Sequence, residues 1–325
     1  MAALANLFSA ALRGVIVAPP GKRLLVGDLS NIEGRVVAWL AGEEWKLRAF
    51  SDFDAGAGPD IYCLAYSKLF GVTPEAVTKS QRQVGKVVEL MLGYGGGVGA
   101  FITGAETYRI NLEEMAAHAW PLMPRDVQLE AEKFWWWSEE ENKTFGLSHD
   151  VFVACDGIKR LWRRAHPKIV QFWADAEHAV RVVIEHGTPA LAGRLEFDKV
   201  GAWLRMKLPS GGYLSYPAPR IEGGKITFLG MSPYSRKWAR QPTWGGTLVE
   251  NATQATARDV LAVGLLRAEG IGLNPVLHVH DEIICEVAGI QPEVLKLEME
   301  AGENWTQGLP LAAKVFATDR YRKGD

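Results

Sequence analysis

The sequence predicts an α+β fold in which both ends of the chain build one subdomain around an antiparallel sheet. Near the N-terminus, an apolar run at residues 24–29 (LLVGDL) has the character of a short buried strand and contains Asp28 close to its end. Near the C-terminus, residues 276–287 (VLHVHDEIICEV) predict two strands joined by a tight turn that contains Asp281. Helical patterns dominate the long stretch between these two runs. We therefore expect a second, largely helical subdomain inserted between the two halves of the first.

The composition excludes some classes of protein and leaves others open. A chain of 325 residues that is 48% hydrophobic can bury a sizeable core and divide into two subdomains. The formal net charge of −2 gives no indication of a nucleic-acid partner, although basic residues can still gather on one face. Three widely spaced cysteines predict neither a disulfide framework nor a zinc site, and they favour a reducing cytoplasm. No apolar run reaches transmembrane length, so we expect no membrane segment.

The first predicted elements follow from short apolar runs and the residues that interrupt them. Residues 1–12 have no basic residue ahead of their apolar stretch, so they predict a short helix ending near Arg13 rather than a signal peptide. Residues 15–18 (VIVA) predict a strand before a Pro-Pro-Gly turn. Residues 31–41 predict a helix, with Gly42 as its stop.

The next predicted elements are helices with recognisable starts. Asp60 is suited to cap a helix over residues 61–70. Pro74 fits the first turn of a short helix after that. Ser80 is predicted to cap a longer helix over residues 81–92.

That longer helix carries a stripe of chemically graded side chains. Arg82, Lys86, Leu90 and Tyr94 recur every four residues and therefore lie along one helix face. Two cations followed by an apolar and an aromatic residue match the order of a triphosphate, a sugar and a base. A solvated basic edge of an amphipathic helix is the alternative interpretation. The glycines at 95–99 match neither a Rossmann fingerprint nor a P-loop.

The remainder of the chain predicts an inserted lobe, further helices and several hairpins. Residues 104–150 have the composition of an inserted helical lobe. Residues 156–187 predict helix interrupted at Pro167, with an early basic cluster that could face either a nucleic-acid backbone or solvent. The later elements are strands and hairpins over 194–228, a helix over 245–269 that contains Gln254, the hairpin over 276–287, a helix over 292–300 and a strand over 311–316.

The acidic turn at residues 280–282 has two interpretations. It can be an ordinary hairpin with a polar turn, which is the usual case. Alternatively, its carboxylates stay partly solvated and ionised and face a cleft. The second interpretation requires a partner for Asp281 elsewhere in the chain. Asp28 and Ser30 are also typical of a helix N-cap, and capping by Ser30 is compatible with an Asp28 that faces a cleft.

Three stretches, taken in order and spacing, resemble the motifs of a known family, the family A (DNA polymerase I-type) DNA polymerases. The first is residues 28–35 (DLSNIEGR), the second is Arg82-x3-Lys86-x7-Tyr94-Gly95, and the third is residues 279–282 (VHDE). Weaker matches join them at residues 60–61, at Gln254 with Asp259, and at residues 302–305. The resemblance runs from about residue 13 to the end and is to a divergent, phage-like member.

This resemblance implies an arrangement of subdomains and an activity. Residues 1–40 and 246–325 would form the polymerase palm with its antiparallel sheet. Residues 41–245 would form the largely helical fingers, with the inserted lobe at about 104–150. The implied activity is that of a DNA-directed DNA polymerase, which transfers a nucleotide from a dNTP to a primer 3′-OH with two Mg²⁺ ions. The implied location is the cytoplasm of a bacterial or phage-infected cell.

The resemblance also implies roles for individual residues. Asp28, Asp281 and the carbonyl of Leu29 would bind the metal ions, and Lys86 would join the two aspartates in catalysis. Glu33 would block a ribose 2′-OH. The residues expected to bind the nucleotide are Glu33, Tyr62, Arg82, Lys86, Leu90 and Tyr94, and those expected to contact DNA are Arg35, Gln254, His280 and Glu282.

Several departures from the family pattern bear on these expectations. Leu90 and Tyr62 stand where the family usually has an aromatic residue and a histidine. The family's thumb and 3′–5′ exonuclease would precede residue 1. The sequence is therefore expected to be either a fragment of a longer protein or one that has a second polypeptide as a partner, besides primer-template DNA and dNTPs. Two other functions remain open: a non-catalytic nucleic-acid-binding palm and fingers subunit or relic, and a two-metal phosphohydrolase.

Overall fold

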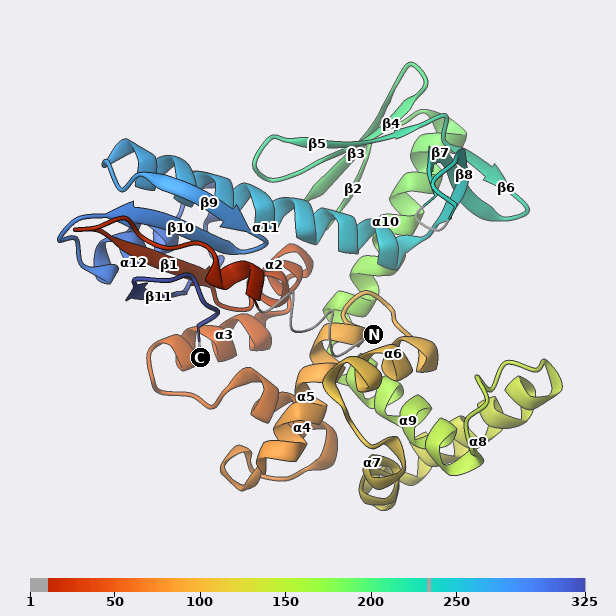
Figure 1. Cartoon of the computed structure of the whole chain (residues 1–325). Helices are drawn as coiled ribbons and strands as arrows, with labels where there is room; N and C mark the ends of the chain where they lie inside the picture. Colours follow the sequence, from red (N-terminus) through yellow and green to blue (C-terminus); the bar gives the residue numbers. More distant parts are fainter. Residues whose placement is uncertain (1–10, 233–234, 325) are drawn as a thin grey trace. The chain divides into compact units, whose positions relative to one another are not determined.

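In the computed structural model, which describes residues 11–232 and 235–324, both ends of the chain contribute strands to one antiparallel sheet (Figure 1). This arrangement and the mostly helical remainder confirm the predicted α+β fold class. The strand order is β11 (Ala313–Thr318), β1 (Arg23–Leu29), β10 (Glu282–Val287) and β9 (Pro275–Val279).

The two faces of this sheet have different partners. On one face, α12 (Pro292–Glu300) packs over Gly27, where a Cβ atom would displace the side chain of Met299. On the other face, Val26 and Ile284 are fully buried with Tyr321. Because side chains alternate along a strand, Asp28 lies on the face of Val26, opposite to α12.

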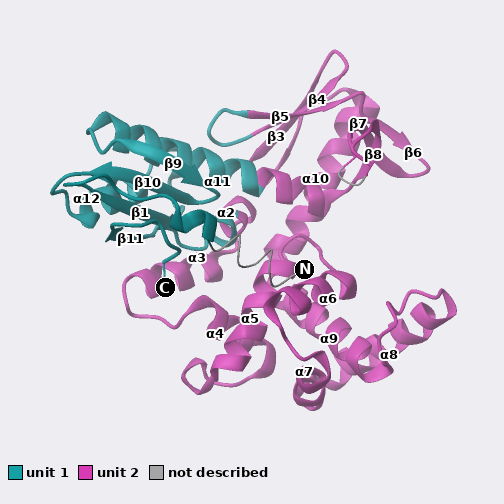
Figure 2. Ribbon diagram, viewed as in Figure 1, with its two compact units in different colours: residues 1–36, 208–212, 253–325 teal, residues 37–207, 213–252 magenta. Residues whose placement is uncertain are grey.

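The chain divides into two compact units, which Figure 2 shows in separate colours. Unit 1 comprises residues 1–36, 208–212 and 253–325, and unit 2 comprises residues 37–207 and 213–252. The helices α2 (Ile32–Ala41) and α11 (Gly245–Gly270) each contribute residues to both units. The boundaries predicted after residues 40 and 245 fall within α2 and at the start of α11.

Unit 2 is mostly helical and carries two small sheets. The predicted interruption at Pro167 is confirmed, because α9 ends at Ala165 and α10 begins at Pro167. Among the described residues, no helix combines the length and the apolar character needed to cross a membrane. The helices are α3 (Glu44–Asp54), α4 (Ile61–Phe70), α5 (Lys79–Leu92), α6 (Val98–Tyr108), α7 (Leu112–Ala119), α8 (Arg125–Glu140), α9 (His149–Ala165) and α10 (Pro167–His186), with 3₁₀ turns η1 (Pro74–Ala76) and η2 (Trp120–Leu122). The sheets are β2 (Ala190–Ala192), β3 (Leu195–Val200), β4 (Trp203–Lys207) and β5 (Tyr213–Pro217), then β6 (Arg220–Glu222), β7 (Lys225–Met231) and β8 (Trp238–Thr243).

Helix ends agree with the sequence at α4 and differ at α5. The carboxylate of Asp60 accepts hydrogen bonds from the first N–H groups of α4, as predicted. The start of α5 was predicted at Ser80, but Thr78 is the cap, because its hydroxyl and the side chain of Gln81 bond reciprocally to the main chain.

Two expectations for the N-terminal region have different outcomes. The predicted strand at residues 15–18 is wrong, because only an isolated bridge joins Val17 to Arg320. The predicted N-terminal helix falls largely on residues 1–10, which lie outside the described part of the chain, and the described residues 11–14 are helical.

Candidate active site

Strand pairing brings the predicted aspartates together, although most of the chain separates them in sequence. Asp28 on β1 is directly opposite Glu282, the first residue of β10. Asp281 precedes Glu282 in the turn, and its main-chain carbonyl accepts a hydrogen bond of 3.1 Å from the N–H of Leu29. The two carboxylates are therefore neighbours at one end of the sheet, on main chain that is fixed by the ladder.

The electrostatics of this cluster follow from crowding like charges in a half-buried place. Burial, followed by the carboxylates of Asp281 and Glu282, raises the pKa of Asp28 to about 6. Lys323 and Lys314 oppose this rise. Burial and then Glu282 also raise the pKa of Asp281. A bound cation would stabilise the ionised form of these carboxylates, because it offsets their mutual repulsion.

The turn that carries Asp281 has an unusual conformation. His280 is the first residue of a two-residue turn and has a φ of 54°, in the left-handed region. Glycine is the usual residue at such a position, and a histidine there costs of order 1–3 kcal/mol. The side chain of His280 is exposed, next to the aspartates. Strain of this kind is concentrated at functional sites.

Two residues that were predicted to contact DNA are buried inside unit 1. Glu282 is 4% exposed and accepts a hydrogen bond from the hydroxyl of Tyr321. Arg35 is 1% exposed and donates to the carbonyls of Ser30 and Pro310. Because both side chains are buried, neither is accessible for the predicted contact with DNA. The link between Tyr321 and Glu282 was missed, because no motif marks Tyr321.

The aspartates fit the requirements of Mg²⁺. The described residues contain no group of three or more His, Cys, Asp or Glu side chains placed to hold a metal ion. However, Mg²⁺ sites in enzymes that act on phosphates commonly use one or two carboxylates, with waters and substrate oxygens as the other ligands. Asp28 and Asp281 supply two such carboxylates, and their mutual repulsion favours binding of a divalent cation.

Replacing Asp28 by Asn is expected to stabilise the metal-free protein at pH 8. A carboxyl whose pKa is raised on folding lowers the free energy of unfolding once it is ionised. The variant has no ionisable group at this position, so its free energy of unfolding is not lowered in this way. The difference in unfolding midpoint should shrink as the pH falls through 6, where Asp28 binds a proton. Thermal unfolding in EDTA measures it.

Mg²⁺ and a second variant provide the controls. Added Mg²⁺ should raise the unfolding midpoint of the wild type and not that of Asp28→Asn. Asp319→Asn removes an exposed carboxylate that is paired with Arg23 in the same unit, and it should behave as the wild type does. A midpoint of Asp28→Asn below that of the wild type at pH 8 in EDTA would contradict this account of the cluster.

In unit 2, the first three residues of the predicted stripe, Arg82, Lys86 and Leu90, lie on α5. The guanidinium of Arg82 makes two hydrogen bonds of 3.1 and 2.9 Å to the carboxylate of Asp60, and it lies over the ring of Tyr62. The ammonium of Lys86 is 4.8 Å from the ring centroid of Tyr108. Arg82 is therefore held in place, and both cations remain partly accessible.

The other predicted site residues are distributed over both units. Tyr94 lies beyond α5, which ends at Leu92, and is half-buried, as is Leu90. In unit 1, Glu33 is half-buried on α2 and Gln254 is exposed on α11.

A buried ion pair on α5 was missed by sequence reasoning. Glu89 and Lys46 form this pair, and both side chains are almost completely buried. The indole N–H of Trp162 donates a hydrogen bond of 3.2 Å to Glu89. The available signal was a glutamate among the apolar residues of the inward face of α5.

The basic cluster near Pro167 is used inside unit 2. Lys159 and Arg160 both pair with Asp156, which is fully buried. Arg164 pairs with Asp126. The sequence left open whether this cluster faces a nucleic-acid backbone or solvent. In the structure, Lys159, Arg160 and Arg164 instead form ion pairs within unit 2.

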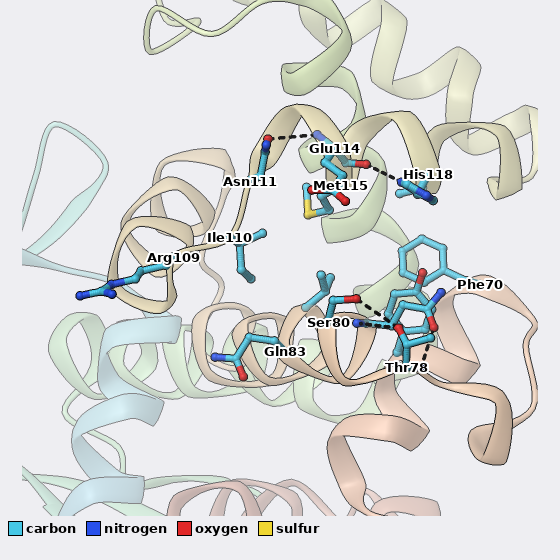
Figure 3. Close-up of a pocket in the computed structure, with 14 residues that line it drawn as sticks. Phe70, Thr78, Ser80, Gln83, Arg109, Ile110, Asn111, Glu114, Met115 and His118 are labelled. Atoms are coloured by element: carbon cyan, nitrogen blue, oxygen red, sulfur yellow. Dashed lines mark hydrogen bonds between the residues drawn. The ribbon is translucent and has the colours of Figure 1, made fainter.

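Two cavities compete as the location of the chemistry. One of about 410 Å³ opens beside the aspartate cluster and is lined by Asp28 and Lys314 among others. A larger one, of about 510 Å³, lies in unit 2, where Ser80 at the start of α5 and Met115 on α7 line it (Figure 3). None of the residues predicted to bind metal, nucleotide or DNA lines the larger cavity. The smaller cavity is the one of these two that predicted site residues line, namely Asp28 and Glu282.

Comparisons with known proteins give a consistent result. Residues 5–116 match the sequence model of DNA polymerase family A, and this segment contains the first two motifs. The chain is 37% identical to a DNA polymerase of Bacillus phage SP02, over 98% of this chain and 44% of the phage protein. It is 43% identical to DNA polymerase I of Chloroflexus aurantiacus over 26% of this chain and 8% of that protein. The chain thus spans less than half the length of these curated relatives.

A solved structure shares the fold. The POL domain of Pol1 from M. smegmatis, in complex with DNA primer-template and dNTP, superposes with a TM-score of 0.55. The match covers 95% of this chain and 42% of the other, at 16% sequence identity. An identity this low indicates a common fold and nothing about ligands.

Proposed function

The chain is related to the DNA polymerases of family A, and from this relationship we propose that it is the catalytic core of a template-directed DNA polymerase. It transfers a nucleotide from a dNTP to the 3′-OH of a primer. The observation that carries the proposal is the pairing of β1 with β10, which makes Asp28 and Asp281 neighbours. A pair of aspartates on a sheet is what two-metal nucleotidyl transfer requires.

The residues of unit 1 hold the metal ions and the primer end. Asp28 and Asp281 bind Mg²⁺ through their carboxylates, and the carbonyl of Leu29 is a further ligand. The chemistry that Mg²⁺ supplies at such a site is activation of the attacking hydroxyl and neutralisation of charge on the leaving pyrophosphate. His280 and Gln254, which are both exposed, contact the primer and the minor groove.

The residues of α2 and α5 bind and select the nucleotide. Arg82 and Lys86 bind the triphosphate, and Lys86 donates a proton to the leaving pyrophosphate. Tyr94 stacks beside the new base pair. Glu33 excludes a ribose 2′-OH. With Leu90 in place of the family's aromatic residue, selection of the sugar depends more heavily on Glu33.

Tight binding of the primer-template is proposed to need contacts beyond these 325 residues. Contacts with the phosphate backbone dominate affinity for DNA, and the relatives contain long regions that this chain does not match. We propose that a thumb and an exonuclease, on a longer form of the same chain or on a second polypeptide, supply these contacts in the cytoplasm of a bacterial or phage-infected cell.

Primer extension tests the proposed function. The purified chain, at high concentration and low salt, should add to a labelled primer only the nucleotide that the template dictates, and EDTA should stop the addition. The same assay with each dNTP alone separates template-directed addition from untemplated addition. Binding of DNA and dNTP without any extension, with Mg²⁺ or Mn²⁺ and over a range of enzyme concentrations, would contradict the proposal.

A further inference from the structure

The C-terminal segment after β11 is fastened to unit 1 next to the aspartate cluster. Tyr321 is 2% exposed and packs against Val26 and Ile284. Its N–H donates a hydrogen bond of 2.9 Å to the carbonyl of Ile16, and its hydroxyl donates to Glu282. Because both the main chain and the side chain of Tyr321 are held, the residues that follow it have little freedom to move away. Figure 2 shows this segment within unit 1.

This anchoring places cations on the wall of the cavity that contains Asp28. The cavity of about 410 Å³ is lined by Asp28, Glu282, Lys314 and Lys323, with Phe316 between them. Lys314 on β11 is the register partner of Asp28 on β1, so their side chains project from the same face. Lys314 and Lys323 are both exposed. Two ammonium groups therefore line the same cavity as Asp28, one of the proposed metal ligands.

If carboxylates alone lined this cavity, it would repel a nucleic-acid strand. Phosphates are anionic, and a cluster of like charges repels them until it is neutralised. Ammonium groups on the same cavity provide an attraction that does not depend on metal. Lysine suits this role because its ammonium is a compact point charge with three donors.

We propose that Lys314 and Lys323 form a subsite beside Asp28 that binds a phosphate group of the nucleic acid or the nucleotide that reacts there. The inference rests on the proposed function for the identity of these substrates. The subsite binds a phosphate group. That phosphate belongs either to the backbone of the primer or to the triphosphate of the incoming nucleotide, and these two sources are separated by the measurements below.

The salt dependence of DNA binding tests the subsite. A fluorescent primer-template is titrated with the protein in EDTA at several KCl concentrations. Each phosphate that a lysine neutralises adds about 0.9 to the magnitude of the slope of log K against log salt. For the double variant Lys314→Gln/Lys323→Gln, this magnitude should therefore decrease by about 1 to 2. The variant with arginine at both positions should keep the wild-type slope, because it keeps the charge.

A matched control lies on the other face of the sheet. Lys296 is on α12, where it pairs with Glu300, and Lys296→Gln should bind DNA as the wild type does. Unfolding midpoints are compared for all variants, and each should lie well above the temperature of the binding assay. A variant that is folded at that temperature shows that removal of the ammonium groups, and not incomplete folding, weakens binding.

A second titration identifies the source of the phosphate. Loss of DNA affinity with unchanged binding of a fluorescent dNTP assigns the subsite to the primer backbone, and the reverse result assigns it to the triphosphate. The proposal is overturned if both affinities of the double variant match those of Lys296→Gln, or if the wild type binds neither ligand at low salt. The wild type could show a salt slope of DNA binding that depends on the two lysines and yet never extend primers. That result would refute the polymerase function but would still support the subsite.

Discussion

Replacing Asp281 by Asn is expected to lower the rate of primer extension by at least about 1000-fold. The amide has the shape of the carboxylate but no charge, so it cannot hold Mg²⁺ against the substrate phosphates. A metal ion contributes several kcal/mol to the transition state in such reactions, and each 1.4 kcal/mol is worth about tenfold in rate. Single-turnover extension with saturating DNA and dNTP measures the chemical step directly.

The structure indicates that this variant should fold. The bond that ties the turn to β1 runs from the N–H of Leu29 to the main-chain carbonyl of Asp281, which the substitution keeps. DNA binding in EDTA should therefore survive. Asp319→Asn, an exposed carboxylate of the same unit, should extend primers at the wild-type rate. Asp28→Asn should be as inactive as Asp281→Asn, and the double variant little worse, because the two carboxylates act as one unit. Undiminished extension by Asp281→Asn would remove the turn from the active site.

Much of the fold could be predicted because its signals are local. The strands β1, β9 and β10 are identified by short apolar runs, one before Asp28 and one on either side of the acidic turn. Polar turn residues mark where these runs end. Helix ends were less predictable, because Thr78 and Ser80 are both good caps. The reciprocal bond with Gln81 decides between them, and that bond depends on spacing from the true start of α5. The run at 15–18 has the composition of a strand, but strand formation needs a partner, and a single bridge to Arg320 is all that it has.

The candidate site was predictable where motifs carry it and not where packing does. Asp28 and Asp281 were paired by the family resemblance, and the register of β1 with β10 brings them together. The burial of Arg35 and Glu282 could not be foreseen, because a motif does not say which of its charged side chains are held inside the fold, as Glu282 is by Tyr321. The roles of Tyr321, Lys314 and Lys323 could not be predicted for the same reason, because their positions depend on the pairing of β11 with β1. Long-range contacts of this kind leave no period in the sequence.

The Lys46 to Met substitution is expected to destabilise unit 2 by about 3–5 kcal/mol. The side chain of Lys46 is 2% exposed and that of Glu89 is 4% exposed, so removing the cation leaves a buried carboxylate without its main partner. Burial alone would raise the pKa of Glu89, but Lys46 and His166 outweigh it and hold the pKa below its ordinary value. Burial and then Lys46 lower the pKa of His166, and Glu89 opposes them. Urea unfolding followed by tryptophan fluorescence measures the change, with Trp162 as a probe inside the cluster.

The pH dependence of this effect has a definite sign. In the wild type, the depressed pKa of Glu89 contributes stability that is fully present above the normal titration range of glutamate. This contribution is lost only as the pH falls from that range toward the lower pKa of Glu89 in the folded protein. In the Lys46→Met variant, burial dominates and raises the pKa of Glu89. The variant should therefore become more stable, relative to the wild type, as the pH falls from 8 to 5.

The double variant Lys46→Met/Glu89→Met separates the value of the pair from the cost of breaking it. Apolar side chains of similar volume often replace a buried ion pair without loss, so the double variant should regain most of the stability lost in Lys46→Met. Lys143→Met breaks an exposed pair with Glu141 in the same unit and should change stability by less than about 1 kcal/mol. A double variant as unstable as the single one would mean that packing around Lys46, and not an uncompensated charge, is responsible.

The same cluster connects stability to nucleotide binding. Glu89 lies on α5 between Lys86 and Leu90, and its partners come from α3 and α9 of the same unit. The ion pair therefore fixes α5, and with it the helix face that carries Arg82 and Lys86. If the double variant recovers stability but binds dNTP more weakly, the pair is needed to orient α5 as well as to stabilise the fold. If it recovers both properties, apolar packing alone orients the helix, and the charges at Lys46 and Glu89 are dispensable for binding.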